Sequence, residues 1–103
     1  MRPIHVVQLD KARLALILTR ELVRPHLRMI TIAPITSTIR GGFTELAVGK
    51  SNGLDHSCVV RLDNIQAVDA SQVGRLVGFL LPDQERELAT AISRAFDLAD
   101  PGF

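Results

Sequence analysis

Hydroxyl and guanidinium side chains follow an apolar stretch in the segment APITSTIRGGFT, residues 33–44. Both groups donate hydrogen bonds to anionic oxygens, and the planar fork of arginine matches a phosphate bidentately. The segment is therefore a candidate phosphate-binding site, and an ordinary solvated loop is the alternative interpretation. The candidate residues are Thr36, Ser37, Thr38 and Arg40.

The next three residues extend this interpretation. Gly41 and Gly42 would let the backbone approach a phosphate, and Phe43 would stack on a base. A flexible loop without a ligand would have the same composition.

A second candidate pair is Arg61 and Asp63, two residues apart on a predicted strand and therefore on one face. The arginine would orient the carboxylate and lower its pKa. Asp63 is the leading candidate for a general base, although a strongly lowered pKa would leave it only to brace Arg61. A surface ion pair without a catalytic role is the alternative.

The chain as a whole has the composition of a small folded domain. With 103 residues, 47% hydrophobic and 22% charged, it predicts a single domain over residues 1–103 with a modest core that a partner subunit would help to stabilise. A net charge of +1 excludes a polycation held to nucleic acid by long-range attraction alone. Local placement of arginines must therefore supply any affinity for phosphate.

The single cysteine and the hydropathy pattern indicate the cellular compartment in which the protein is expected. Cys58 is the only cysteine, so no internal disulfide forms, and a reduced cytoplasm is expected. No 18-residue apolar run or signal-peptide core occurs, so we expect no membrane association. His5, His26 and His56 show no fixed spacing and predict neither a metal site nor a catalytic pair.

The elements that must position these residues are mostly strands. Alternating and β-branched patterns predict strands over residues 3–9, 14–19, 29–35, 43–48, 57–62 and 76–81, with a further short strand after residue 64 and a helical turn near residue 71. The first two strands should form a hairpin, Pro34 should close the third strand or sit at a bulge, and Gly78 should mark a close backbone approach. An amphipathic helix with Pro82 in its first turn follows.

The order of these segments resembles the MazF/PemK/Kid toxins over roughly residues 3–98. The resemblance is carried by KARLALILTRE, ITIAPITSTIRG, TELAVG, SCVVRLDNIQAVD and VGRLVGFL, followed by the helix. It implies an α+β fold, an SH3-like antiparallel β-barrel (PemK/CcdB-like) with a C-terminal amphipathic helix.

The resemblance also implies roles for individual residues. Arg13 matches the family's catalytic arginine and Thr36 its partner threonine at the RNA groove, while Arg61 and Asp63 match positions that assist RNA binding or proton transfer in part of the family. Leu14 stands where the family usually has proline, and the loop before Arg13 is short. We expect these departures to change the aim of Arg13 and the base preference more than the chemistry.

The implied function is the toxin of a type II toxin–antitoxin system, a metal-independent and sequence-specific endoribonuclease that cuts single-stranded RNA and stops translation. The resemblance also implies that the protein needs no cofactor, that it forms a homodimer, and that it has a cognate MazE-like antitoxin whose acidic C-terminal segment would occupy the RNA groove. The alternatives are a non-enzymatic toxin of the same fold that inhibits DNA gyrase, and an RNA-binding barrel that has lost catalysis.

Overall fold

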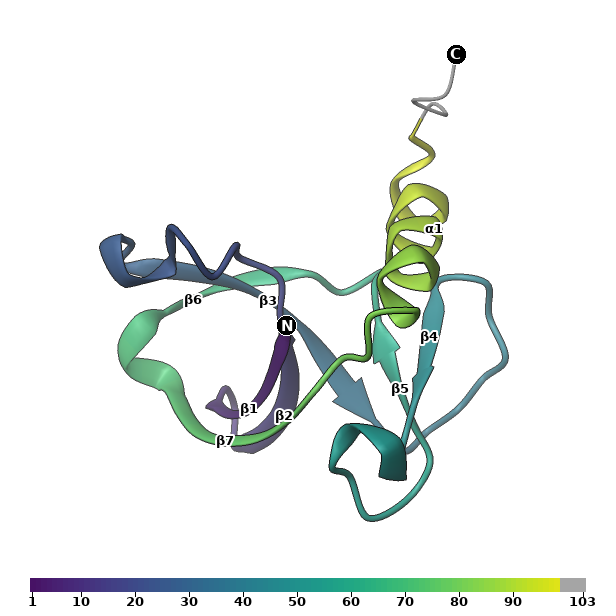
Figure 1. Ribbon diagram of the computed structural model, residues 1–103, viewed down its shortest axis with the longest axis horizontal. Coiled ribbons are helices and arrows are strands. Elements are labelled where there is room, and N and C mark those ends of the chain that lie inside the picture. Colours follow the sequence, from purple (N-terminus) through teal and green to yellow (C-terminus); the bar gives the residue numbers. More distant parts are fainter. Residues whose placement is uncertain (99–103) are drawn as a thin grey trace.

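The computed structural model describes residues 1–98. These residues form seven strands and one α-helix, whose arrangement is shown in Figure 1. The strands are β1 (Pro3–Gln8), β2 (Ala12–Ile17), β3 (Met29–Thr36), β4 (Glu45–Val48), β5 (Cys58–Arg61), β6 (Gln66–Asp69) and β7 (Val73–Phe79). Three short 3₁₀ helices, η1 (Arg24–His26), η2 (Lys50–Asn52) and η3 (Ala70–Gln72), lie in the connections, and α1 (Gln84–Phe96) follows β7.

All strand pairings are antiparallel, in the order β4-β5-β3-β2-β1-β7, with β6 also paired to β3. The long strand β3 has two partners on one side, because residues 29–32 pair with β6 and residues 35–36 pair with β5. The sheet therefore curls into a half-barrel, with α1 lying beside β4 and β5 (Figure 1). The predicted α+β barrel with a C-terminal helix is confirmed in this half-closed form.

Pro34 lies inside β3, so the prediction that it closes the strand or sits at a bulge is wrong. It pairs with Ala15 of β2, and the strand continues to Thr36. On the other side of β3, the β6 pairing ends at Ile32 and the β5 pairing begins at Ile35. Proline is accommodated because it lies where β3 changes neighbours and the ladder on that side is interrupted.

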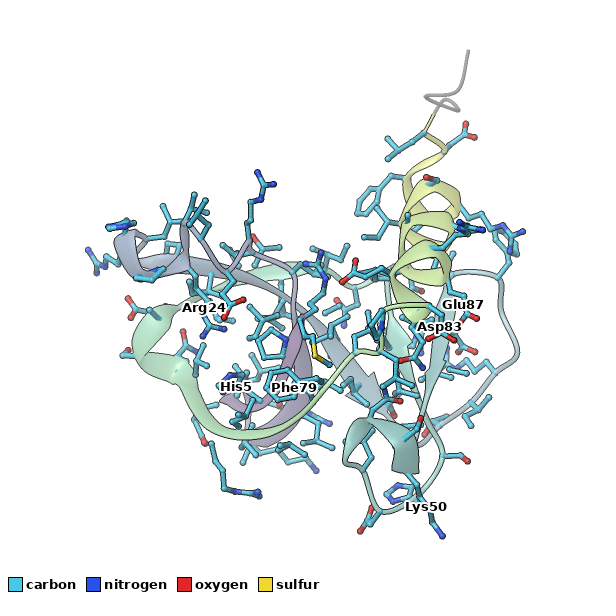
Figure 2. The ribbon with its side chains drawn as sticks, viewed as in Figure 1. His5, Arg24, Lys50, Phe79, Asp83 and Glu87 are labelled. Carbon is cyan, nitrogen blue, oxygen red and sulfur yellow. The ribbon has the colours of Figure 1, made fainter. Side chains whose placement is uncertain are left out.

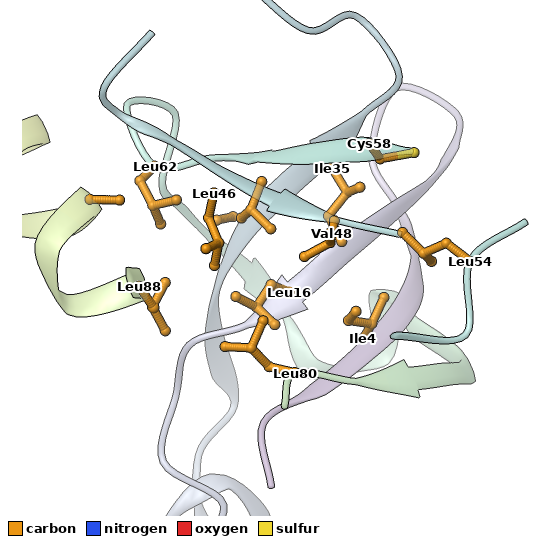
Figure 3. Packing of buried hydrophobic residues seen from close by; sticks show 13 residues of the cluster. Ile4, Leu16, Ile35, Leu46, Val48, Leu54, Cys58, Leu62, Leu80 and Leu88 are labelled. Carbon is orange, nitrogen blue, oxygen red and sulfur yellow. The ribbon is translucent and has the colours of Figure 1, made fainter. Parts of the chain in front are cut away.

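Two apolar clusters form the core, one on each side of β2. Leu16 packs into the larger cluster between the sheet and α1, where Leu88 of the helix also lies (Figure 3). Ala15 and Ile17 face the opposite way, into a smaller cluster inside the curl of the sheet. Because both faces of β2 are buried, its sequence reads as a continuous apolar run instead of an alternating pattern.

Helix α1 begins at Gln84, two residues later than Pro82. The chain turns at residues 82–83, and the Gln84 side chain reaches back to accept a hydrogen bond from the Leu81 amide at 2.8 Å. The helix buries Leu88 and Ala91, and its acidic first turn suits the positive end of the helix dipole. No helix within residues 1–98 is long and apolar enough to span a bilayer.

The close backbone approach predicted at Gly78 is confirmed. A Cβ atom built on Gly78 would lie 1.8 Å from the carbonyl oxygen of Asn52, which ends η2. The buried Asn52 side chain accepts from the Gly49 amide at 3.0 Å and donates to the Phe79 carbonyl at 3.0 Å. One glycine and one amide therefore fasten the turn before β5 to the end of β7.

Candidate active site

A cleft of about 700 Å³ lies where three segments meet: the β1–β2 turn, the end of β3 with the residues after it, and the end of β5 with the turn after it. Its polar lining includes Asp10, Arg13, Thr36, Thr38, Arg40, Arg61, Asp63, Asn64 and Gln66. These segments become neighbours because β3 pairs with β2 along one edge and with β5 at its end. The curl of the sheet thus assembles residues that lie more than fifty positions apart in the sequence.

Arg13 lies in β2 opposite Val7, and its guanidinium is held by Asp10 of the preceding turn. Nε donates to Oδ1 at 2.8 Å and an Nη donates to Oδ2 at 3.0 Å. This bidentate pair raises the pKa of Arg13 and holds the pKa of Asp10 well below its usual range. Arg13 is therefore a permanent cation that can stabilise negative charge but cannot accept a proton.

Leu14 continues the β1–β2 ladder opposite Val6, so the hairpin keeps a regular register through the position where the family usually has proline. The predicted hairpin is confirmed, although β2 runs over Ala12–Ile17 and so begins and ends two residues before the predicted range.

Thr36 is the last residue of β3 and lines the same cleft as Arg13. Its hydroxyl oxygen accepts a hydrogen bond from the Thr38 amide at 3.1 Å. That bond uses an acceptor lone pair and leaves the hydroxyl hydrogen available to donate. Thr36 can therefore donate a hydrogen bond toward an anionic oxygen in the cleft.

Arg61 and Asp63 form the second ion pair of the cleft. Nε donates at 3.2 Å and an Nη donates at 3.0 Å to the two carboxylate oxygens. The strand ends at Arg61, so the prediction that both residues share a strand face is wrong. The pairing forms because Asp63 lies in the turn that follows the strand and folds back toward the arginine. Hydrogen bonding from Arg61 lowers the pKa of Asp63, so the carboxylate is ionised at neutral pH.

The predicted site residues that follow β3 do not all lie in the same place. Thr38 and Arg40 line the cleft, whereas Ser37 is exposed and is not among the lining residues. Phe43 is 67% exposed and borders a separate groove between β4 and α1. The structure therefore brings six of the eight predicted site residues into one cleft, and the predicted stacking of Phe43 on a base receives no support from its position.

The backbone of the two loop glycines has a different partner from the one expected. The Gly41 and Gly42 amides donate to the Glu45 carboxylate at 2.9 and 3.2 Å, so they are not free to bind a phosphate. The groups that remain for an anion include the guanidinium and hydroxyl side chains that line the cleft.

Sequence reasoning missed Asp10, Asn64 and Gln66. Asp10 had a readable signal, because an arginine three positions after an acidic residue at a tight turn can fold back and pair with that residue. Asn64 and Gln66 had none, since they enter the cleft only through the path of the chain after β5. Within residues 1–98 no group of three or more His, Cys, Asp or Glu side chains is arranged to hold a metal ion.

Fold and cleft together define a small α+β half-barrel protein that presents guanidinium and hydroxyl groups in one open cleft. Comparison with known proteins gives the family. A sequence profile of the family described as PemK-like, MazF-like toxin of type II toxin-antitoxin system matches residues 5–96. The chain belongs to this family.

Individual relatives agree with that assignment. The chain is 57% identical over 98 residues to the endoribonuclease MazF3 of Mycobacterium tuberculosis, covering 95% of each chain. The solved structure of the Mycobacterium tuberculosis toxin MazF-mt6 matches with a TM-score of 0.94 and 56% identity, covering 96% of this chain and 100% of that one. An endoribonuclease from a mycobacterial species, solved in complex with its cognate antitoxin, matches with a TM-score of 0.84 and 25% identity over 96% of this chain and 95% of that one.

Proposed function

We propose that the protein is a toxin that cuts single-stranded RNA without a metal ion, with Arg13 and Thr36 at the scissile phosphate. Family membership and the 57% identical relative, which is named an endoribonuclease, support the endoribonuclease activity in this proposal. The observation that carries the proposed site is that Arg13, Thr36 and Arg61 line one cleft, although they come from three different strands.

The reaction that suits these groups is attack by the ribose 2′-hydroxyl on the adjacent phosphorus. The new O2′–P bond forms as the P–O5′ bond breaks, which gives a 2′,3′-cyclic phosphate and a 5′-hydroxyl. The 2′-hydroxyl loses a proton and the leaving oxygen gains one, while negative charge grows on the phosphoryl oxygens. Groups in the cleft can meet two of these requirements, the growing negative charge and the proton that leaves the 2′-hydroxyl, and water supplies the proton that the leaving oxygen gains.

Arg13 stabilises the charge on the phosphoryl oxygens. It is a permanent cation on a paired strand, so it requires little reorganisation to meet the transition state. Thr36 donates its hydroxyl hydrogen to a phosphoryl oxygen or holds the 2′-hydroxyl. Asp10 accepts from Nε and one Nη of Arg13, so the remaining N–H groups of the guanidinium are available to donate to a phosphate while the pair stays in place.

Asp63 is the carboxylate that would accept the 2′-hydroxyl proton. Its lowered pKa keeps it ionised at neutral pH but makes it a weak base, so its contribution to the rate is smaller than that of Arg13. Arg61, Arg40 and Thr38 bind the neighbouring phosphates.

Partners follow from the same proposal. The protein acts as a homodimer, and its antitoxin places an acidic, otherwise disordered segment in the cleft where its carboxylates imitate phosphate charge. Guanidinium groups that line an open cleft suit such a segment as well as they suit RNA.

The direct test is incubation of the purified, folded protein with a mixed-sequence pool of single-stranded RNA in EDTA. We expect cleavage at a short sequence, with cyclic phosphate and 5′-hydroxyl ends identified by end-labelling. An intact pool would contradict the proposal. Binding of RNA without cutting would favour an inactive RNA-binding barrel, and gyrase-dependent DNA breaks with intact RNA would favour a gyrase inhibitor.

A further inference from the structure

Glu45 is an acidic side chain with an unusual environment for a residue at the start of a short strand. It opens β4 directly opposite Arg61 of β5, and its side chain is only 5% exposed. A carboxylate withdrawn from water is costly unless charges or hydrogen-bond donors compensate it. Its partners therefore indicate what the residue is for.

The partners are three consecutive backbone amides of the loop before β4. The Arg40 amide donates to Oε2 at 3.2 Å, and the Gly41 and Gly42 amides donate to Oε1 at 2.9 and 3.2 Å. The Arg61 Nε lies 4.0 Å from Oε2. One carboxylate thus holds the loop and faces an arginine of the cleft.

Packing does not hold this loop. A Cβ atom added at Gly41 or Gly42 would meet no atom within 4 Å, and Gly41 has the left-handed φ of 77°. The side chains of Ile39 and Phe43 are exposed as well. The hydrogen bonds to Glu45 are therefore the main constraint on the path of the loop.

The constraint reaches the cleft through two arginines. Arg40, whose amide is bonded to Glu45, lines the cleft and adds its charge to the hydrogen bond from Arg61 that lowers the pKa of Asp63. Arg61 lies between Asp63 at 3.0 Å and Glu45 at 4.0 Å. Without the Glu45 carboxylate, the Arg40 amide would lose its hydrogen-bond acceptor, and Arg61 would lose one of its two neighbouring negative charges.

We propose that Glu45 is a positioning residue for RNA, fixing the Arg40 loop and Arg61 so that both guanidinium groups face the bound strand. It touches no substrate and acts through its neighbours. The proposal rests on the proposed function for its kinetic consequence, whereas its structural content, a loop held by one carboxylate, can be measured without RNA.

The first measurement is amide hydrogen exchange by NMR on the wild-type protein. The Arg40, Gly41 and Gly42 amides should exchange at least about tenfold more slowly than in an unstructured peptide, because each is hydrogen-bonded. Exchange at peptide-like rates would overturn the proposal without any variant.

The second measurement is Glu45→Gln, which keeps the size of the side chain but replaces one acceptor oxygen by a donor. We expect faster exchange at the three amides. We also expect the KM for a cleaved RNA oligonucleotide to rise about tenfold and kcat to change less than about threefold, because poorly positioned arginine side chains weaken RNA binding more than they slow the chemical step. An unchanged KM in a folded variant would overturn the proposal.

The matched control is Glu87→Gln, which neutralises an exposed carboxylate near the start of α1 (Figure 2). Exchange of the loop amides and the KM should stay at wild-type values. If the wild-type protein cuts no RNA, the proposed function fails, while amide exchange in the wild type and in Glu45→Gln still decides whether Glu45 holds the loop.

Discussion

Two loops of this molecule are each fastened by one polar side chain, yet they are built in opposite ways. At η2, the buried Asn52 bonds a turn to the end of β7, and the backbone of Gly78 lies against the Asn52 carbonyl with no room for a side chain. At the cleft, Glu45 bonds a loop whose glycines have open space around them. The first loop is fixed by close packing together with the hydrogen bonds of a buried side chain, and the second by hydrogen bonds without packing, so substitutions in the first should cost stability and those in the second should cost function.

The largest effect on stability should come from Gly78→Ala. The added Cβ would lie 1.8 Å from a backbone oxygen, so the η2 turn or β7 must move. We expect a loss of more than about 3 kcal/mol in unfolding free energy, or failure to fold, measured by urea denaturation. A stability close to wild type would contradict the packing side of the comparison.

Asn52→Ala should come next. The substitution leaves the partly buried Gly49 amide and Phe79 carbonyl without their partner. We expect a cost of about 2 kcal/mol. RNA cleavage by the folded fraction should stay at the wild-type rate, and a specific loss of cleavage would show that the two loops are coupled.

The two glycines of the loop before β4 provide a matched pair with smaller effects. Gly41→Ala should cost about 1 kcal/mol because its φ of 77° disfavours a side chain, although there is space for one. Gly42→Ala has space and no such conformation, so its stability should change by less than about 0.5 kcal/mol. A large loss at Gly42 would show that packing also holds this loop.

The smallest effect should be the contribution of the cleft ion pairs to acid stability. The pKa values of Asp10 and Asp63 are lowered in the folded protein by hydrogen bonds from Arg13 and Arg61. A lowered folded-state pKa means that the pairs stabilise the fold above about pH 4, the usual aspartate range, and that this is lost as the pH falls further. Both carboxyl groups are exposed, so the effect is small.

The variant Asp10→Asn tests the contribution of one of these ion pairs. The drop in the urea midpoint between pH 7 and pH 3 should be slightly smaller in the variant than in the wild type. A larger drop in the variant would show that the Asp10–Arg13 pair does not contribute in the expected direction.

Much of the fold could be predicted from residue patterns, because strands such as β1 and β3 are apolar runs bounded by charges and turn residues. The errors fall where tertiary contacts override local rules. Pro34 is tolerated inside a strand because β3 changes neighbours there, and α1 starts after Pro82 because the Gln84 side chain bonds the preceding turn. Neither reason is local in the sequence.

The residues of the cleft could likewise be predicted only in part. Arg13, Thr36 and Arg61 could be named from their chemistry and from the family resemblance. The hold of Glu45 on the loop and the entry of Gln66 depend on how β4 and β5 pair and where the chain goes next. Phe43 was named from its type alone, and an aromatic side chain after two glycines does not reveal which groove it borders.

The central claim is that Arg13 and Thr36 act together on one scissile phosphate. It is tested most directly by single-turnover cleavage of a cleaved RNA oligonucleotide in EDTA by Arg13→Ala and Thr36→Val, with Arg75→Ala, an exposed arginine on β7, as the control. We predict rates about 10²- to 10³-fold below wild type for Arg13→Ala, a clear but smaller loss for Thr36→Val, and no loss for the control. Cleavage by Arg13→Ala at the wild-type rate would contradict the account.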